Sequence, residues 1–120
     1  MLKSYKDLIV WQKSMDLVFM VYKLTKSFPK EEQFGLVAQM QRAAVAIPSN
    51  IAEGYARQHK PEYIQFLSIA YASGAELETQ LKIAEKLGYG DRGTYLKIYS
   101  LLEEVSKMLN VMMTKLKGGR

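Results

Sequence analysis

The chain has 120 residues, a formal net charge of +5 and no cysteine. This length fits one domain, residues 1–120, with a real hydrophobic core, and the lack of cysteine excludes disulfides and thiolate metal sites. No segment approaches the roughly 18 apolar residues of a membrane-spanning helix, and the early charges at the N-terminus are unlike a signal peptide. We therefore expect a cytoplasmic protein without a membrane partner.

Positive charge is concentrated toward the two ends of the sequence. Residues 1–30 contain six Lys or Arg and two Asp or Glu, and residues 91–120 contain six and three. Residues 61–90 contain two and four. A basic surface attracts nucleic acids and anionic lipids, but ordinary solvated surfaces carry similar charge, so both interpretations stay open.

Turn-forming residues divide the chain into four long segments. They cluster around residues 27–29, 57–61 and 88–93. The segments between them show no sustained alternation of polar and apolar residues, which argues against strands. The sequence therefore predicts an all-α protein with helices at about 7–27, 34–57, 61–87 and 94–116.

The first predicted helix, residues 7–27, is apolar over an unusually wide arc. Asp7 suits its N-terminus because a carboxylate caps free N–H groups and opposes the helix dipole. Two neighbouring seams recur at helical spacing, formed by Trp11, Met15, Val18 and Tyr22 and by Leu17, Val21, Leu24 and Phe28.

The second predicted helix, residues 34–57, has almost no polar face. Apolar and small residues cover one side, namely Leu36, Met40, Ala43, Ile47, Ile51 and Gly54, and also the opposite side, namely Ala38, Val45, Ala52 and Ala56. Such a helix needs neighbours on more than one side. Since the core of one bundle supplies only one, we predict a subunit contact along Ala38, Val45 and Ala52.

Pro48 lies in the middle of this second helix. Proline lacks an N–H group and its ring clashes with the carbonyl of Ala44, so a kink is expected. Alternatively, the helix breaks, and Asn50 with Glu53 forms a capping arrangement that restarts it. The apolar pattern stays in phase across Pro48, which favours a kinked, continuous helix.

The third and fourth predicted helices, residues 61–87 and 94–116, have apolar seams at helical spacing. Pro61 suits a first helical position. Gly74 in mid-helix costs about 1 kcal/mol relative to alanine, so we expect another helix to approach closely there. Four such helices with short loops predict an antiparallel up-down-up-down four-helix bundle. In this topology the first and fourth helices are neighbours, and the two basic ends lie side by side.

Three sequence blocks resemble one protein family. They lie in the family's order and at comparable spacing along nearly the whole chain, at Tyr5–Lys13 (YKDLIVWQK), Arg42–Gly54 (RAAVAIPSNIAEG) and Ala75–Leu81 (AELETQL). The family is the small bacterial four-helix-bundle family encoded in intervening sequences of 23S ribosomal RNA genes, also labelled ribosomal protein S23.

The resemblance implies a four-helix bundle that assembles as a homopentamer. It also implies a relation to the accessory variability protein of diversity-generating retroelements, a basic barrel that binds a reverse transcriptase and nucleic acid. The family often has two adjacent basic residues where this chain has Gln41 and Arg42. This difference lowers the nucleic-acid binding that the resemblance implies for the second helix.

A polar stripe runs along the second predicted helix, with a matching polar face on the third. Its members are Arg42, Asn50, Glu53 and Arg57, and the matching residue is Glu76. We interpret them as a structural network between helices or subunits, because buried polar groups need partners. The alternative is a ligand or nucleic-acid contact at Arg42 and Arg57.

Catalysis and metal binding have no candidates in this sequence. Di-iron bundles need Glu-x-x-His pairs on facing helices, and the only histidine, His59, falls in a predicted loop. We therefore expect no catalytic residues, no metal site and no cofactor.

The leading hypothesis is a non-enzymatic homo-oligomer, a pentamer by resemblance, that binds RNA or DNA weakly and without base recognition. The expected phosphate contacts are basic side chains near the chain ends, Lys6, Lys13, Lys23, Lys97, Lys115, Lys117 and Arg120. The alternative is a protein-interaction scaffold, with a partner such as a reverse transcriptase and no nucleic-acid binding of its own.

Overall fold

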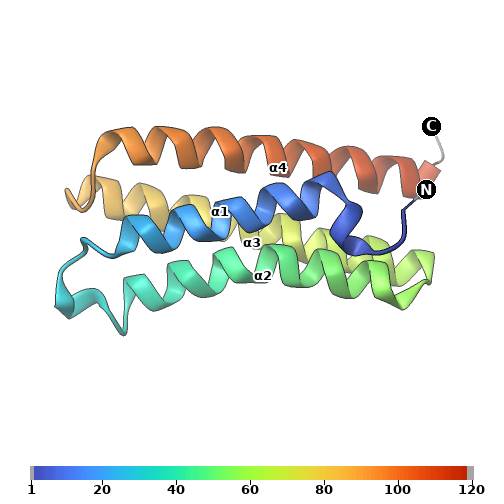
Figure 1. The fold of residues 1–120 in the computed structure, drawn as a ribbon, viewed down its shortest axis with the longest axis horizontal. Coiled ribbons are helices and arrows are strands. Elements are labelled where there is room, and N and C mark those ends of the chain that lie inside the picture. Colours follow the sequence, from blue (N-terminus) through green and yellow to red (C-terminus); the bar gives the residue numbers. More distant parts are fainter. Residues whose placement is uncertain (1, 119–120) are drawn as a thin grey trace.

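The computed structural model describes residues 2–118, and four long helices make up most of it (Figure 1). Their bounds are Ile9–Thr25 for α1, Leu36–Arg57 for α2, Lys60–Lys86 for α3 and Arg92–Gly118 for α4. Two 3-10 turns, η1 (Tyr5–Asp7) and η2 (Lys30–Glu32), precede α1 and α2. No strand occurs in residues 2–118, so the predicted all-α class is confirmed. Each predicted helix end lies within two residues of the observed one.

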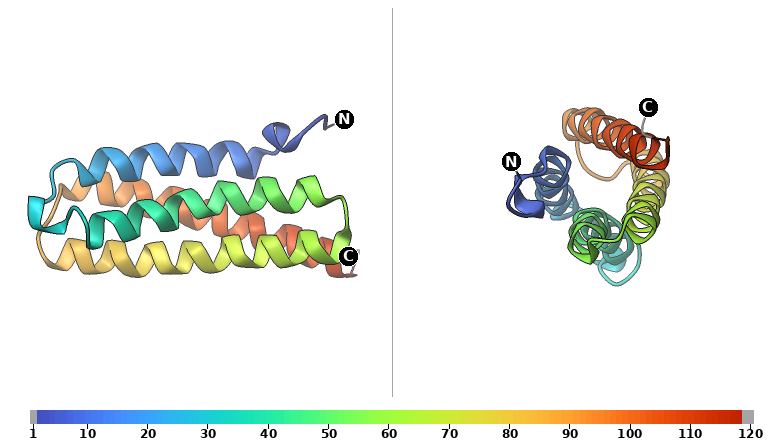
Figure 2. Two further views of the ribbon diagram at one scale, coloured as in Figure 1. Left: turned by 90° about the horizontal axis from the view of Figure 1, so that it is seen from below. Right: turned by 90° about the vertical axis from the view of Figure 1, so that its right-hand side faces the viewer.

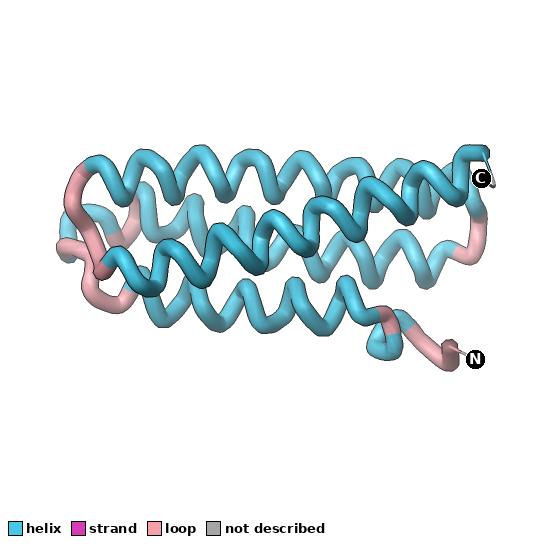
Figure 3. The backbone as a smooth tube through the Cα atoms, turned by 90° about the horizontal axis from the view of Figure 1, so that it is seen from above, coloured by secondary structure: helices cyan, strands magenta, loops and turns pink. Residues whose placement is uncertain are grey.

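Successive helices run antiparallel, and each packs against the next (Figure 1, Figure 2). α1 also packs against α4, which closes the four helices around a common core. The most extensive contact is between α2 and α3. All connections between the helices lie at the two ends of the bundle (Figure 3). The predicted antiparallel up-down-up-down four-helix bundle is confirmed.

The chain enters α1 through the turn η1. Ser4 and Asp7 form a capping box, in which the Ser4 Oγ accepts the Lys6 N–H (3.1 Å) and the Asp7 carboxylate accepts the Ser4 N–H (3.3 Å). The same carboxylate also accepts the N–H of Lys3 (2.8 Å). The sequence places Asp7 at the start of the first helix, whereas the structure places it one element earlier. The reason is that Leu8 has an extended backbone, which separates η1 from α1.

The core contains apolar side chains from all four helices. Each helix contributes side chains with no exposed surface, for example Leu17, Ile47, Leu77 and Ile98. The largest fully buried side chain is Tyr95 on α4, whose hydroxyl donates to the backbone carbonyl of Tyr89 at 2.8 Å. Removal of this apolar surface from water is the main contribution that holds the helices together.

The pKa of Tyr95 predicts an alkaline limit of stability. Burial, with smaller contributions from the charges of Glu85 and Asp91, raises this pKa to about 12. The stabilising contribution of the neutral phenol is therefore complete below the unfolded-state pKa of about 10 and is lost as the pH rises through about 12. Phenylalanine has no ionisable hydroxyl group. We therefore expect Tyr95→Phe to lose less of its free energy of unfolding than the wild type between about pH 10 and pH 12, as measured by urea unfolding at a series of pH values. An identical pH dependence in both proteins would contradict the assignment.

α2 continues without interruption through Pro48. The alternative of a broken helix is wrong, because the Asn50 side chain donates to the Ala46 carbonyl (2.7 Å) within the same helix and caps no new one. Glu53 pairs instead with Arg57, one turn further on. The ring of Pro48 is buried, and the kink at this residue stays a prediction.

Of the two glycines compared, Gly54 and not Gly74 marks the tighter approach of a neighbouring helix. A Cβ atom at Gly54 would lie 2.7 Å from the Cβ of Phe66 on α3, closer than nonbonded carbon atoms come in proteins. At Gly74, a Cβ atom would lie 3.4 Å from side-chain atoms of Leu102 and Ser106, an ordinary contact. The expected neighbouring helix, α4, thus lies in contact at Gly74, but it leaves room there for a Cβ atom.

Candidate nucleic-acid interface and assembly face

The packing of α1 against α4 brings the two basic ends of the chain side by side. Lys6 in η1 lies at the end of the bundle where Lys115 and Lys117 occupy the last turn of α4 (Figure 1). Lys23 in the last turn of α1 lies at the opposite end, as does Lys97 near the start of α4. These predicted phosphate contacts therefore form two groups at opposite ends of the bundle. Four of them lie on α1 and α4, whereas Lys6 lies on η1, which packs against α1 and α2.

The predicted phosphate contacts differ in how free their charges are. Lys13 on α1 is engaged, because its Nζ lies 3.0 Å from Glu104 Oε2 on α4. Arg120 lies outside the described residues. The other five side chains are exposed and form no ion pair within residues 2–118: Lys6, Lys23, Lys97, Lys115 and Lys117. A phosphate therefore meets less competition at these five positions than at Lys13.

The predicted polar stripe does not join into one network within the chain. Arg57 pairs with Glu53 of its own helix at 3.0 Å and also with Glu62 of α3 at 3.7 Å. The exposed pair within α2 adds only about 0.2–0.5 kcal/mol. Glu76 accepts a hydrogen bond from a glutamine of its own helix at 3.3 Å, and Asn50 bonds a backbone carbonyl of α2. Arg42 is exposed and forms no ion pair among the described residues. A network between subunits stays a prediction.

A shallow apolar groove of about 300 Å³ runs between α1 and α2. Its lining includes four side chains from the predicted apolar arcs, Trp11, Met15, Val45 and Ala52, and also Phe19, which the predicted seams did not include. Phe19 is 64% exposed and Val45 39% exposed. Contiguous apolar surface of this kind marks interaction sites in soluble proteins. Two of the three residues predicted for the subunit contact, Val45 and Ala52, thus line the α1–α2 groove, whereas Ala38 lines a different pocket.

A larger pocket of about 530 Å³ lies where α1 ends and α2 begins, beside η2. Phe34, at its rim, is 91% exposed. The sequence prediction missed this pocket because it placed Phe34 inside the second helix, whereas α2 begins only at Leu36. The sequence signal that could have identified this pocket was the aromatic Phe34 next to Gly35, in a segment that also contains Lys30.

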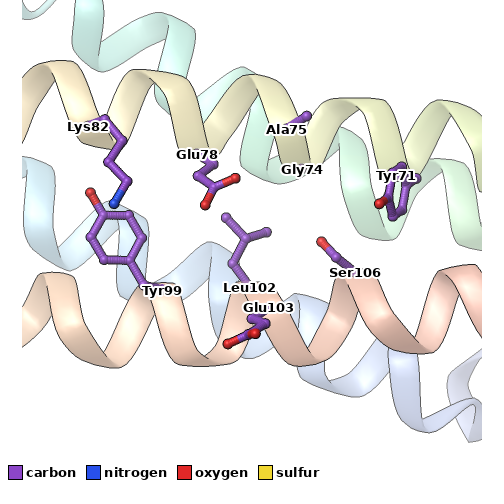
Figure 4. A pocket seen from close by; sticks show the side chains of 9 residues that line it. All are labelled: Tyr71, Gly74, Ala75, Glu78, Lys82, Tyr99, Leu102, Glu103 and Ser106. Atoms are coloured by element: carbon purple, nitrogen blue, oxygen red, sulfur yellow. The ribbon is translucent and has the colours of Figure 1, made fainter.

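A third cleft, of about 410 Å³, lies between α3 and α4 (Figure 4). Lys82 Nζ lies 4.3 Å from the centre of the Tyr99 ring, and the Tyr99 hydroxyl donates to Glu85 at 2.9 Å. Burial and this carboxylate raise the pKa of Tyr99. The Lys82 ammonium group is thus placed against the Tyr99 ring, and the Tyr99 hydroxyl has the Glu85 carboxylate as its hydrogen-bond acceptor. The other charged residues of the cleft, Glu78 and Glu103, are exposed and would repel a phosphate.

The part of the chain that the structure describes contains neither a candidate metal site nor a candidate membrane-spanning helix. Residues 2–118 hold no group of three or more His, Asp or Glu side chains arranged to bind a metal ion. Within the same range, no helix combines the length and the apolar character that crossing a membrane requires.

Two comparisons with known proteins agree on one family. The model of the 23S rRNA-intervening sequence protein family matches residues 6–111. A crystal structure from Bacteroides thetaiotaomicron, described as a protein with unknown function from the S23 ribosomal protein family, is similar with a TM-score of 0.80 and 25% sequence identity. The similarity covers 88% of this chain and 98% of that chain. No curated protein matches, and neither description names an enzymatic activity. The chain therefore belongs to the 23S rRNA-intervening sequence protein family.

Proposed function

We propose that this chain is a non-enzymatic, cytoplasmic bundle that assembles into a homopentamer and binds RNA or DNA weakly through the phosphate backbone. The observation that carries the proposal is the α1–α4 face, which we define by Lys23, Lys97, Lys115 and Lys117. These lysines from both ends of the chain are exposed and form no ion pair among residues 2–118.

The chemistry of these side chains suits a contact without base recognition. A lysine ammonium is a point charge on a flexible stem, and contacts to phosphate carry no sequence information by themselves. Each such contact releases condensed counterions, which makes affinity fall steeply as salt rises. The proposed contacts are Lys6, Lys23, Lys97, Lys115 and Lys117, with a smaller share from Lys13 and an addition from Arg120.

The assembly part of the proposal is supported by the α1–α2 groove. This groove leaves apolar side chains such as Phe19 and Val45 exposed in the isolated chain, and a second copy would remove them from water. The number of subunits, five, is supported by the family resemblance alone.

Charge reversal at the end of α4 tests the nucleic-acid contact. In Lys115→Glu with Lys117→Glu, we expect the slope of log affinity against log salt to decrease in magnitude by about 0.7–0.9 for each phosphate that the protein no longer neutralises. The affinity should fall equally for all sequences. Fluorescence anisotropy with labelled RNA over a series of salt concentrations measures both quantities.

The matched control for this experiment is Lys107→Glu, compared with Lys115→Glu alone. Lys107 lies on the same helix but pairs with Glu103 at 3.5 Å, so its reversal changes the net charge without removing a proposed phosphate-binding side chain. An equal decrease in affinity in the two variants would show that the effect comes from net charge alone and not from a phosphate contact at Lys115. Undetectable binding at low salt would refute the nucleic-acid part of the proposal.

The second candidate function is a protein-interaction scaffold, and the α1–α2 groove favours it. The same apolar surface could receive a partner protein, such as a reverse transcriptase, in place of a second copy. Reversing the charges of Lys97, Lys115 and Lys117 would then leave partner binding intact, because none of these residues lines the groove. A pull-down with the purified partner separates the two candidates.

A further inference from the structure

The pocket between the end of α1 and the start of α2 combines aromatic and cationic side chains. Three aromatic residues line it, the buried Phe28 and the exposed Tyr22 and Phe34, together with two lysines, Lys26 and Lys30. Its volume of about 530 Å³ lies within the range of about 300–1,000 Å³ that is usual for small-ligand sites. The pocket therefore has room for a planar ring beside charged groups.

Phe34 is the most unusual residue of this pocket. With 91% of its surface exposed, its ring contributes little to the core of the isolated chain, and it lies in a turn where a polar residue would be ordinary. Tyr22, on the neighbouring α1, is 42% exposed. Two accessible aromatic faces at one pocket are the stacking platform that single-stranded nucleic acids use, because every base has a π-face.

The charge around the pocket fits a phosphate backbone. No Asp or Glu is among the residues that line it, whereas Lys26 and Lys30 both are, and both are exposed. Of the two neighbouring carboxylates, Glu32 accepts a hydrogen bond from the hydroxyl of Tyr89 at 3.0 Å, so it is engaged outside the pocket. Glu31 is exposed next to Lys30.

Amide groups complete the pocket. Gln41 is held by a hydrogen bond from its Nε2 to the Thr25 hydroxyl (3.2 Å), and Gln33 lines the exposed side. Amide side chains can bond the edges of bases. The combination of π-faces, cations and amides is typical of sites for single strands and loops, in which bases are unstacked and reachable.

We propose that this pocket binds a single-stranded segment of nucleic acid, with bases stacked on Phe34 and Tyr22 and phosphates at Lys26 and Lys30. The inference rests on the proposed nucleic-acid binding and extends it, because it names single strands as the preferred class and adds aromatic contacts at the end of α1, where Lys23 also lies. A duplex offers no free base face and is contacted through its phosphates and sugar hydroxyls.

The test compares a labelled oligouridine, which stacks weakly on itself, with an RNA duplex of equal length, by fluorescence anisotropy. We expect Phe34→Ala to weaken oligouridine binding at least fivefold, the loss of about one stacked base, and to leave duplex binding unchanged. Phe34→Trp should restore the affinity. Phe34 is almost fully exposed, so these variants should fold. Tyr71→Ala, at a 41% exposed tyrosine of α3, is the matched control and should have no effect.

The outcomes separate this inference from the proposed function. If Phe34→Ala weakens neither ligand while Lys115→Glu weakens both, the pocket site is refuted and the α1–α4 contact stands. If the wild-type chain binds neither ligand at low salt, both proposals fail. If Phe34→Ala shifts the protein to a smaller species in sedimentation velocity, the pocket is a contact between copies of the chain, and the single-strand site is overturned.

Discussion

Replacing Gly54 by alanine is expected to lower the free energy of unfolding by about 1–3 kcal/mol, the usual cost of adding a carbon atom to a filled core. The new Cβ would lie 2.7 Å from the Cβ of Phe66 and 3.2 Å from Cδ1 of Tyr63. A Cβ atom cannot rotate away from its backbone, so α2 and α3 would have to move apart. These two helices share the most extensive contact of the bundle, which makes their separation costly.

The control for this prediction is Gly74→Ala, a second glycine in a helix interior. Alanine there would make only ordinary contacts of 3.4 Å with Leu102 and Ser106, so the gain in helix propensity should dominate, up to about 1 kcal/mol. We therefore expect the two substitutions to change stability in opposite directions. Urea unfolding followed by circular dichroism measures both, and stabilisation by Gly54→Ala would contradict the tight crossing.

Replacing Val45 by glutamate is expected to convert the assembled protein to a folded monomer. Val45 is 39% exposed in the isolated chain and lies in the α1–α2 groove, so the new carboxylate can stay hydrated while the chain is alone. In the proposed assembly, the same carboxylate would be buried without a partner, at a cost of several kcal/mol per ion. Sedimentation velocity at micromolar concentration measures the change.

The matched control for Val45→Glu is Leu96→Glu. Leu96 is 55% exposed on α4 and does not line the α1–α2 groove, so the same charge should leave the assembly intact there. Circular dichroism checks that both variants keep their helices. A wild-type chain that sediments as a stable monomer would contradict the proposed assembly, whatever the variants do.

The helices were predictable because their signals are local. Apolar residues at helical spacing and the turn residues between them depend only on neighbours in sequence, so each end was predicted to within two residues. The errors at the ends have local causes as well. Asp7 caps η1 because the extended Leu8 intervenes, and Phe34 precedes α2 because that helix begins after Gly35.

The candidate sites were less predictable because they depend on contacts between helices. The side-by-side placement of the basic ends follows from topology, and the sequence predicted it. The ion pair of Lys13 with Glu104 joins residues far apart in sequence, and no local pattern identifies it. The two glycines differ for the same reason. Gly54 and Gly74 are equally unfavourable for a helix, and only the positions of Phe66 and Tyr63 on α3 make Gly54 the tighter site.

The sequence by itself determined the four helices, their antiparallel order and the excess of apolar surface on α1 and α2, since periodicity, turns and composition are properties of the chain alone. Only the tertiary structure decided which lysines are free, where two backbones meet, and that Phe34 and Tyr22 share a pocket with Lys26 and Lys30. These features arise from distances between segments that are far apart in sequence, and such distances exist only after the helices have packed.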